Sequence, residues 1–353
     1  MPRSLLLILR KIFVLEILVL GISVFFLSGT VAAQLLPASP PVADPTDRRF
    51  DAVREDWTTP ALARGTLRPV QPLLGSVNDQ ATYTLELLRL QWRAVDPLDV
   101  YVIKPKNIKN PPVVMYLYGY PAETDIFRDP EYDEAVTKDG FAAVCFVAAL
   151  TGHRYHERPM KEWFISELQE SLATSAHDVQ MMLDYLAARN DLDMSRVGFF
   201  GQGAGASIGI LASAVDPRIK VLQALDPWGD WPTWMATSPF VPEDERANYV
   251  KPDFLKKVST LEPVEWLPKV QAKKFRFQQQ EFDKNTPASS KEKLRAAVPP
   301  GAEVTVYKTP QEYAAVMFGS KQLDWMRNAL RSLPEAAPDK TPADAKAPVA
   351  SSK

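Results

Sequence analysis

The residues from Val197 to Gly205 carry the pattern richest in chemical meaning. They read Val-Gly-Phe-Phe-Gly-Gln-Gly-Ala-Gly, so an apolar strand passes into a glycine-rich turn and then into an expected helix of small residues over 204–215. In the G-x-S-x-G pattern of a nucleophile elbow, such a turn lifts a serine above a parallel sheet, where its hydroxyl can attack an acyl carbon. Here the serine position is Gly203, which has no side chain to attack with. The amides that open the helix remain, and they favour a small anion such as a carboxylate.

General-base chemistry at that turn would need a histidine or a carboxylate. The chain has three histidines. The last of them, His177, lies beside Asp178 in the middle of an expected helix, where a structural role is favoured. His153 and His156 share one loop, but this metal-binding spacing has no third ligand in the sequence, so no metal is predicted. Hydrogen bonding within the loop, or recognition of a ligand with help from Arg154, is favoured instead.

Carboxylates follow several of the expected strands. Asp226 and Asp230 follow one strand, and Asp283 and Glu312 follow later ones, so these carboxylates could form a cluster at one edge of a sheet. Two carboxylates can run acid–base chemistry between them. Ser207 is the nearest hydroxyl after the turn, but it lies one helical turn further on and is expected to pack the helix.

Composition argues against several classes of function. The net charge is −2 over 353 residues and no long Lys/Arg block occurs, so nucleic-acid binding is not expected. The single cysteine, Cys145, lies in an apolar run and cannot form an internal disulfide, so a buried and inert thiol is expected. No cofactor is predicted.

The N-terminus has the character of a targeting segment. Residues 1–33 combine basic residues, an apolar run and a small-residue end at Ala33, which predicts a Sec-type signal peptide and a periplasmic or secreted protein. Cleavage there would leave no stable membrane insertion. The alternative is an uncleaved anchor over residues 12–33, although Glu16 lies within its apolar run.

The rest of the chain divides by composition into a folded part and two flanking segments. Residues 34–50 are rich in proline and are expected to form a linker. Residues 333–353 are rich in Pro, Ala and Lys, without aromatic residues, and are expected to be disordered. The folded domain is predicted over residues 51–332.

Within that domain, apolar strand-like runs alternate with helical stretches. This alternation predicts an α/β fold, with a mostly parallel sheet and helices on both of its faces. An antiparallel pair is expected to open the sheet. The expected strands are 82–93, 98–104, 113–118, 141–147, 197–200, 219–225, 274–279 and 303–307, and the expected helices are 163–188, 204–215 and 321–331.

The stretch 228–267 interrupts this alternation. It is interpreted as an insertion, rich in tryptophan and proline, over the carboxyl-terminal edge of the sheet, where ligands of open α/β sheets bind. Its tryptophans either line an apolar pocket or hold the insertion on the sheet, and the second role is favoured. They are Trp228, Trp231, Trp234 and Trp266.

With these elements in place, the chain resembles the α/β-hydrolase superfamily over roughly residues 98–331. The resemblance is strongest to its secreted branch of dienelactone hydrolases, acetyl xylan esterases and prolyl-oligopeptidase-type domains. The family's His-Gly-x-Pro loop has its counterpart in Tyr118-Gly119-Tyr120-Pro121. The resemblance therefore implies an oxyanion hole made by the amides of Tyr120 and Ala204.

The resemblance also assigns counterparts to the other two members of a catalytic triad. The family's acid follows the seventh strand, and Asp283 is its counterpart here, with a loop carboxylate or helix cap as the alternative role. The family's histidine follows the last strand, and Glu312 stands at or near that position. Because no histidine follows His177, the family's order of serine, acid and histidine is not available to this chain.

Three hypotheses follow from these residues. The first is an exported pseudohydrolase, without nucleophile or triad histidine, that binds a small-molecule or acyl-type ligand near the loop histidines, Asp226 and Trp228, or serves as a scaffold. The second is an active, serine-independent esterase or peptidase that uses Asp283, Glu312 or a loop histidine. The third is a membrane-tethered interaction protein. The sequence predicts neither the identity of the ligand nor an oligomeric state.

Overall fold

The computed structural model describes most of the chain between Glu55 and Pro334. The described residues are 55–68, 71–93, 96–106, 108–118, 124–151, 154, 163–317 and 321–334. The expected signal peptide or anchor, the expected linker and almost all of the expected tail lie outside them. In the described part of the chain, no helix combines the length and the apolar character that crossing a membrane requires.

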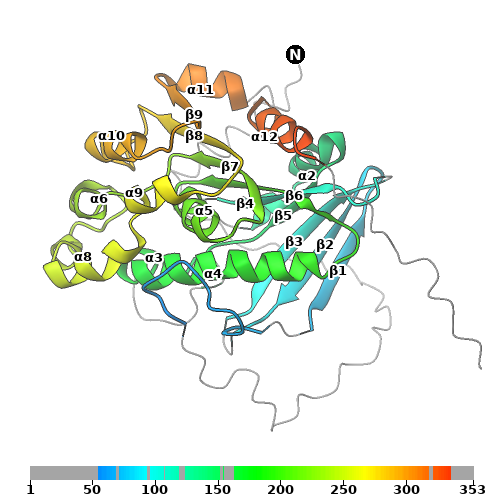
Figure 1. Ribbon diagram of the computed structural model, residues 1–353, viewed down its shortest axis with the longest axis horizontal. Helices are drawn as coiled ribbons and strands as arrows, with labels where there is room; N and C mark the ends of the chain where they lie inside the picture. The colour runs from blue at the N-terminus through cyan, green and yellow to red at the C-terminus, as the bar shows by residue number, and fades with distance from the viewer. Residues whose placement is uncertain are drawn as a thin grey trace, which may run out of the picture. The chain divides into compact units, whose positions relative to one another are not determined.

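The described residues form one mixed sheet of the strands β1 (Leu73–Asp79), β2 (Tyr83–Leu90), β3 (Leu98–Pro105), β4 (Pro112–Leu117), β5 (Ala142–Cys145), β6 (Asp193–Gln202), β7 (Ile219–Leu225), β8 (Lys274–Gln280) and β9 (Glu303–Tyr307). Their order in the sheet is β1-β2-β3-β5-β4-β6-β7-β8-β9 (Figure 1). The pairs β1–β2, β2–β3 and β3–β5 are antiparallel, and every pair from β5 onward is parallel. Strands β4, β5 and β7 are buried almost throughout, as parallel strands covered on both faces must be.

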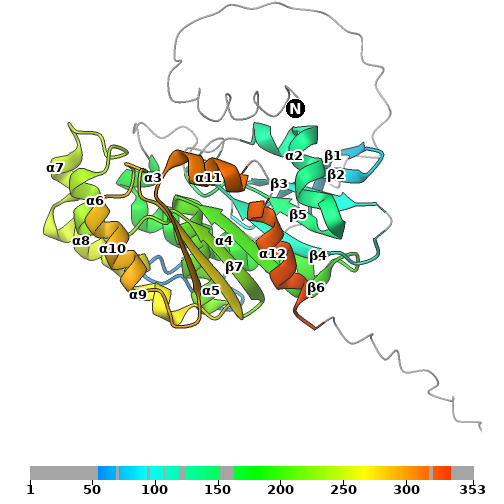
Figure 2. The same ribbon diagram turned by 90° about the horizontal axis from the view of Figure 1, so that it is seen from above.

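The helices are α2 (Pro130–Thr137), α3 (Trp163–Ser166), α4 (Leu168–Ala187), α5 (Ala204–Val215), α6 (Trp231–Thr237), α7 (Arg246–Tyr249), α8 (Pro252–Val258), α9 (Pro263–Trp266), α10 (Ala288–Ala296), α11 (Pro310–Met317) and α12 (Lys321–Arg331). One hydrophobic cluster joins α4 and α5 to the sheet, and a second cluster joins α2 and α12 to its other face (Figures 1 and 2). The predicted α/β fold with helices on both faces of a mostly parallel sheet is confirmed.

The predicted helix over 163–188 is two helices in the structure, α3 and α4. Glu167 interrupts it with φ −111° and ψ 40°. At this break the Ser171 hydroxyl donates to two carbonyl oxygens, that of Phe164 at 3.1 Å and that of Glu167 at 3.0 Å, and the Glu167 oxygen also accepts from the Ser171 amide at 2.8 Å. The apolar spacing runs across this break, which is why the pattern predicted one helix.

Other elements had no signal in the periodicity. All seven residues of β1 are exposed, so the strand has no alternation of buried and exposed side chains to detect. In the 228–267 stretch, Pro232, Pro252 and Pro263 stand in the first turn of α6, α8 and α9. Proline is favoured at that position because it needs no amide hydrogen there, so these prolines begin short helices instead of extending a loop.

Candidate ligand site at the Gly203 turn

The strand-to-helix turn lies between β6 and α5, and Gly203 is its single apex residue. Its backbone has φ 57° and ψ −123°, which glycine adopts without a steric penalty and other residues adopt only under strain. The Gly203 amide donates to the Leu225 carbonyl at 2.9 Å, and the Gly203 carbonyl accepts from the amides of Ala206 at 3.1 Å and Ser207 at 3.2 Å. These bonds fix the turn in the shape of a nucleophile elbow.

Two further glycines explain why the chain can turn so sharply. A Cβ at Gly201 would lie 2.4 Å from the Gly205 carbonyl oxygen, and a Cβ at Gly205 would lie 2.0 Å from the Leu117 carbonyl oxygen at the end of β4. Neither approach leaves room for a side chain, so α5 packs directly against the ends of β6 and β4. Close packing therefore requires glycine at 201 and 205, and the backbone conformation of the turn requires it at 203.

The N-terminus of α5 presents backbone donors at this turn. The helix has 12 residues, and the first of them, Ala204, is buried. No described residue accepts a hydrogen bond from the Ala204 amide, so this donor is available to a ligand oxygen. The other amide expected in an oxyanion hole, that of Tyr120, lies outside the described residues.

Ser207 is tied to the start of the 228–267 stretch. Its hydroxyl donates to the Trp228 carbonyl at 2.8 Å and accepts from the Trp228 amide at 2.9 Å. The Trp228 ring packs on Trp234 and Phe240, with centroids 4.8 Å and 4.9 Å away. Trp228, Trp231 and Trp234 are at most 3% exposed and belong to the main hydrophobic cluster, whereas Trp266 is only partly buried against it.

Asp226 lies beside the turn, directly after β7, and has φ 48°. The register pairs Gln202 with Leu225, so Asp226 follows β7 at the level where Gly203 follows β6. Its Oδ1 accepts from the Gln280 amide at 2.6 Å, and its Oδ2 accepts from the Gln280 side chain. Burial first, and then the charge of Asp283, raise the pKa of Asp226 to about 7. Asp226 is therefore a carboxyl group that exchanges a proton near neutral pH, next to the candidate site.

Asp283, the counterpart of the family's acid, is engaged within its own loop. Its carboxylate accepts from the amides of Asn285 and Thr286, each at 3.1 Å. The Lys291 ammonium lies 4.0 Å from Asp283 Oδ2 and donates to the Gln280 carbonyl at 2.7 Å. These contacts match the loop-carboxylate role that the sequence left open. The negative charge of Asp283 contributes to the raised pKa of Asp226.

Glu312 is placed away from the candidate site. Its side chain is exposed and accepts from the Lys308 amide at 2.7 Å, while the Glu312 amide donates to the Thr309 hydroxyl at 3.2 Å. This reciprocal arrangement resembles a capping box at the N-terminus of α11. The structure therefore does not bring Asp226, Asp283 and Glu312 together as one cluster.

The residue of α11 that faces inward is Tyr313, one position further on. Its ring packs on Tyr307 with centroids 5.4 Å apart and on Phe282 with centroids 6.4 Å apart. Burial first, and then the charge of Asp226, raise its pKa, so the phenol stays protonated and can donate a hydrogen bond. Sequence reasoning missed Tyr313 because it did not predict α11. Without that helix, nothing in the sequence indicates which side chains of this stretch face the sheet.

Tyr118 follows β4, which neighbours β6 on the side away from β7. Its ring lies 5.9 Å from that of Phe200, and its hydroxyl donates to the Tyr132 hydroxyl at 3.3 Å. Tyr132 in turn lies 3.6 Å from the thiol of Cys145, whose pKa is raised by burial. The thiol is buried, as expected, and the tyrosines form a partly apolar wall.

The loop after β5 is described only in part. His153 and His156 lie outside the described residues. Arg154 is buried, and its guanidinium donates to Asp96 at 3.0 Å and lies 2.8 Å from an oxygen of Asp178. These partners hold Arg154 within the protein, so its guanidinium is not directed toward a ligand.

His177 has the structural environment that its position suggested. It is 0% exposed, with Nδ1 2.7 Å from a carboxylate oxygen of Glu55 and Nε2 3.2 Å from the Thr59 carbonyl oxygen. The ring thus joins the described segment before β1 to α4. Within the described residues, no group of three or more His, Cys, Asp or Glu side chains could hold a metal ion.

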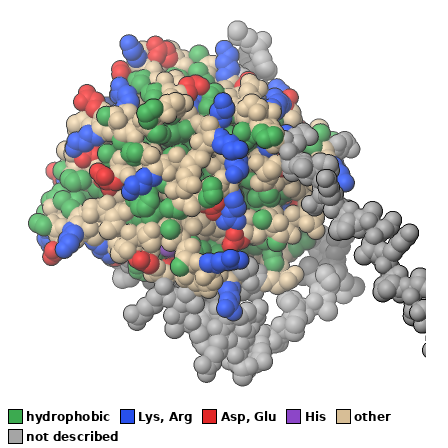
Figure 3. All heavy atoms as spheres, in the orientation of Figure 1, with side chains coloured by type: hydrophobic (Ala, Val, Ile, Leu, Met, Phe, Trp, Pro, Cys, Tyr) green, Lys and Arg blue, Asp and Glu red, His purple; other side chains and the backbone are tan. Residues whose placement is uncertain are grey.

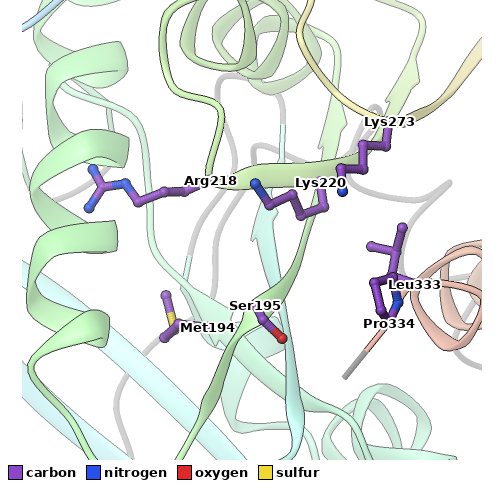
Figure 4. Close-up of a pocket in the computed structure, with 7 residues that line it drawn as sticks. All are labelled: Met194, Ser195, Arg218, Lys220, Lys273, Leu333 and Pro334. Atoms are coloured by element: carbon purple, nitrogen blue, oxygen red, sulfur yellow. The ribbon is translucent and has the colours of Figure 1, made fainter. Parts of the chain in front are cut away.

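A hollow of about 390 Å³ lies at the opposite edge of the sheet (Figure 4). It is lined in part by Ser195 near the start of β6 and by Arg218, Lys220 and Lys273. The Arg218 guanidinium bonds Asp216 at 2.6 Å, and the Lys220 ammonium donates to the Pro217 carbonyl at 2.6 Å, so most of the positive charge here has partners.

The surface in Figure 3 carries charges of both signs. Lys and Arg side chains form a narrow band on that face, among Asp, Glu and apolar side chains. Such mixing is typical of a solvated surface.

Comparison with known proteins identifies the fold. No family model matches the chain. A Bacillus subtilis (strain 168) protein named "Putative hydrolase YtaP" is 24% identical over a match of 182 residues, and the match covers 42% of this chain and 59% of that protein. The chain thus spans less than two thirds of the length of this curated relative.

Solved structures match over a larger share of the chain. Acetyl xylan esterase 1 from Thermoanaerobacterium sp. JW/SL YS485 matches with a TM-score of 0.60 and 14% identity, over 74% of this chain and 88% of that one. An acetyl xylan esterase from Paenibacillus sp. R4 gives 0.58 and 16%, over 73% and 89%. Porphyromonas gingivalis dipeptidyl peptidase 4 gives 0.53 and 14%, over 70% and 36%. The resemblance predicted from the sequence is confirmed, and the chain has the fold of the α/β-hydrolase superfamily.

Proposed function

We propose that this protein is an exported, non-catalytic α/β-hydrolase-fold protein that binds a small acyl-type or carboxylate ligand at the Gly203 turn. The observation that carries the proposal is the turn itself. It has the strained shape of a nucleophile elbow, at φ 57° and ψ −123°, and its apex residue has no nucleophile. The last histidine in the sequence, His177, is fully buried in α4, which further supports a non-catalytic role.

The proposed ligand class follows from the donors at this edge. The N-terminus of α5 offers an amide at Ala204 and the positive end of a 12-residue helix, both of which favour an oxygen that carries negative charge. The acetyl xylan esterases with this fold are named for an acetyl ester, which supports an acyl group or its carboxylate as the ligand. Without a nucleophile, such a group would be bound and released unchanged.

The catalytic part of the proposal is tested with purified protein that begins at Gln34. We expect no turnover of p-nitrophenyl acetate or of short peptides above the buffer rate, together with saturable binding of small carboxylates. Turnover above buffer that is lost in Asp226→Asn or Asp283→Asn would overturn the proposal in favour of a serine-independent hydrolase. A matched Asp184→Asn variant, which changes an exposed carboxylate of α4, controls for the loss of charge.

The export part of the proposal rests on residues 1–33. Mass spectrometry of the protein recovered from its native host is expected to give Gln34 as the first residue. An intact segment over 12–33 would instead favour a membrane-tethered interaction protein.

A further inference from the structure

Residues 55–62, which we call the strap, lie against α4 ahead of the first strand of the sheet (Figure 1). Two side chains of α4, one helical turn apart, hold the strap. Gln180 donates to the Pro60 carbonyl at 2.8 Å and accepts from the Leu62 amide at 3.1 Å. His177 makes two further contacts with the strap. The side-chain amide of Gln180 can make its bonds at any pH, whereas the contacts of His177 depend on how many protons its ring carries.

Both ring nitrogens of His177 face oxygen atoms of the strap. Nδ1 lies 2.7 Å from Oε2 of Glu55, and Nε2 lies 3.2 Å from the carbonyl oxygen of Thr59. A neutral imidazole carries one N–H, so one of its nitrogens would present a lone pair to an oxygen lone pair. His177 is 0% exposed, so bulk water does not reach either nitrogen. A ring that carries protons on both nitrogens satisfies both contacts.

Glu55 takes part as a carboxylate, which can only accept. The Arg93 guanidinium donates to both of its oxygens, at 2.5 Å and 2.7 Å. Burial alone would raise the pKa of Glu55, but the hydrogen bonds from Arg93 and His177 outweigh burial and hold that pKa below its usual value. The proton between Glu55 and His177 therefore belongs to the ring, as in a charge-assisted hydrogen bond.

The charges next to His177 favour one more cation. The described part of this network contains three carboxylates and two guanidiniums, which belong to Glu55, Asp96, Asp178, Arg93 and Arg154. Asp56, the next residue of the strap, is exposed and adds a further negative charge on this side. An imidazolium at His177 balances the buried charges, which lowers the free-energy cost of keeping them away from water.

We propose that His177 is an imidazolium in the folded protein and that its second proton locks the strap on α4, so that rising pH releases the strap. A ring that has given this proton to solvent can donate to Glu55 or to Thr59, but not to both. Because undocking releases a proton, docking weakens as the pH rises. The bonds of Gln180 do not change with pH. This device is separate from the proposed ligand site at the Gly203 turn.

The protonation of the ring is tested by nitrogen NMR. The purified protein carries isotope-labelled histidine, and the signals of His177 are assigned by their absence in His177→Gln. We expect both ring nitrogens of His177 to carry a proton at pH 7, each with a one-bond coupling to hydrogen. A ring nitrogen of His177 that is unprotonated in the folded protein at pH 7 would overturn the proposal.

Docking of the strap is measured with a nitroxide on Ala61→Cys. Ala61 is an exposed residue of the strap, and the native thiol of Cys145 is buried and does not compete for the label. Electron paramagnetic resonance gives the ratio of mobile to docked strap from pH 6 to pH 9. We expect this ratio to rise about tenfold over that range, as for the loss of one hydrogen bond to a charged group.

Two variants of α4 separate the pH-dependent contacts from the others. His177→Gln should raise the mobile fraction already at pH 6 and remove its pH dependence. Gln180→Met is the matched control, because it removes the other two strap bonds at a similar side-chain volume. It should raise the mobile fraction at every pH and keep the dependence on pH. A pH dependence that survives in His177→Gln would overturn the proposal, since another group would then carry it.

Glu55→Gln keeps the proposal testable if His177→Gln does not fold. The amide of glutamine can donate to Nδ1 of a singly protonated ring while Nε2 donates to Thr59, so the pH dependence should be lost. An unchanged pH dependence in Glu55→Gln would overturn the role of this pair. A constant ratio from pH 6 to pH 9 in the otherwise wild-type protein would overturn the switch. Thermal unfolding confirms that each variant is folded.

Discussion

Two aspartates, Asp178 in α4 and Asp226 after β7, are buried to a similar degree and have opposite electrostatic properties. Asp178 is 0% exposed and Asp226 is 7% exposed. Burial alone would raise the pKa of both carboxyl groups, yet the guanidiniums of Arg154 and Arg93 lower that of Asp178 to about 2. The amide groups around Asp226 leave its pKa raised to about 7. The presence of cationic partners, and not the depth of burial, separates the two.

The comparison distinguishes the scaffold from the candidate site. Around Asp178, the Trp92 indole donates at 2.8 Å, Arg154 lies at 2.8 Å, and Arg93 also bonds Glu55 in the segment before β1. This network joins that segment to α4 and to the loop after β5 with charges that remain ionised. Around Asp226, the hydrogen-bond donors are neutral, so its protonation can change at the edge of the sheet where a ligand would bind.

The largest expected effect comes from breaking the Asp178 network. Asp178→Asn leaves the buried guanidiniums of Arg93 and Arg154 without one of their counter-charges. We expect it to lower the free energy of unfolding by about 3–5 kcal/mol, as for a buried ion pair that loses one partner. Urea denaturation at pH 7 measures this change.

Asp184→Asn provides the control on the same helix. The Asp184 carboxylate is 58% exposed and pairs with Arg218 at 2.5 Å. An exposed pair of this kind contributes about 1 kcal/mol or less. Equal losses in the two variants would contradict the idea that Asp178 belongs to the scaffold.

The second effect is a pH dependence that is opposite for the two aspartates. Because the pKa of Asp226 is raised from 3.8 to about 7, the folded state binds a proton that the unfolded state releases, and stability falls as pH rises from about 4 to 7. Because the pKa of Asp178 is lowered to about 2, its contribution is present above about pH 4 and lost as pH falls toward 2. The difference in unfolding free energy between the wild type and Asp226→Asn, measured by urea denaturation from pH 4 to 8, should change by up to about 1.4 kcal/mol per pH unit below pH 7.

The difference between these two proteins isolates Asp226 from other titrating groups. Asp133 in α2 also has a pKa raised by burial to about 7, and it titrates in both proteins and cancels. A difference between wild type and variant that stays constant from pH 4 to 8 would show that Asp226 does not titrate in this range.

The sequence was sufficient for the scaffold because apolar periodicity reports burial. It predicted β4, β7 and α5, where nearly every residue is buried, and it located the turn at Gly203 from the two glycines that pack strand against helix. Strand β1 escaped prediction because all of its residues are exposed. Periodicity carries no information about an element that buries nothing.

The candidate site was harder to predict, because contacts between strand ends decide it. Alignment by position pointed to Glu312, but a shift of one residue along α11 turns Glu312 to solvent and Tyr313 inward. Asp226 was identified as a candidate, yet its raised pKa comes from burial and from the charge of Asp283, which lies far along the chain. Pairwise geometry of this kind is not encoded in any local pattern.

A smaller effect is expected from restoring a hydroxyl nucleophile beside Asp226. Gly203→Ser places a hydroxyl at the apex of the turn, where φ is 57°, and the strain is expected to cost about 1–3 kcal/mol of stability. We expect no hydrolysis of p-nitrophenyl acetate, because no histidine follows His177 to activate the serine. A burst of nitrophenol with this variant would show that another group, Asp226 first, can act as the base.

The smallest effect is expected at Glu312, which the sequence placed in the site and the structure places at the start of α11. Its carboxylate is exposed and accepts from the Lys308 amide at 2.7 Å, a contact that the amide of glutamine can also make. Glu312→Gln should therefore change the free energy of unfolding by less than about 0.5 kcal/mol and leave the binding of small carboxylates unchanged. Urea denaturation and calorimetry with sodium acetate measure these two quantities. If Glu312→Gln weakened carboxylate binding, α11 would present a different face to the sheet edge, and the interpretation of Glu312 as a solvated cap would fail.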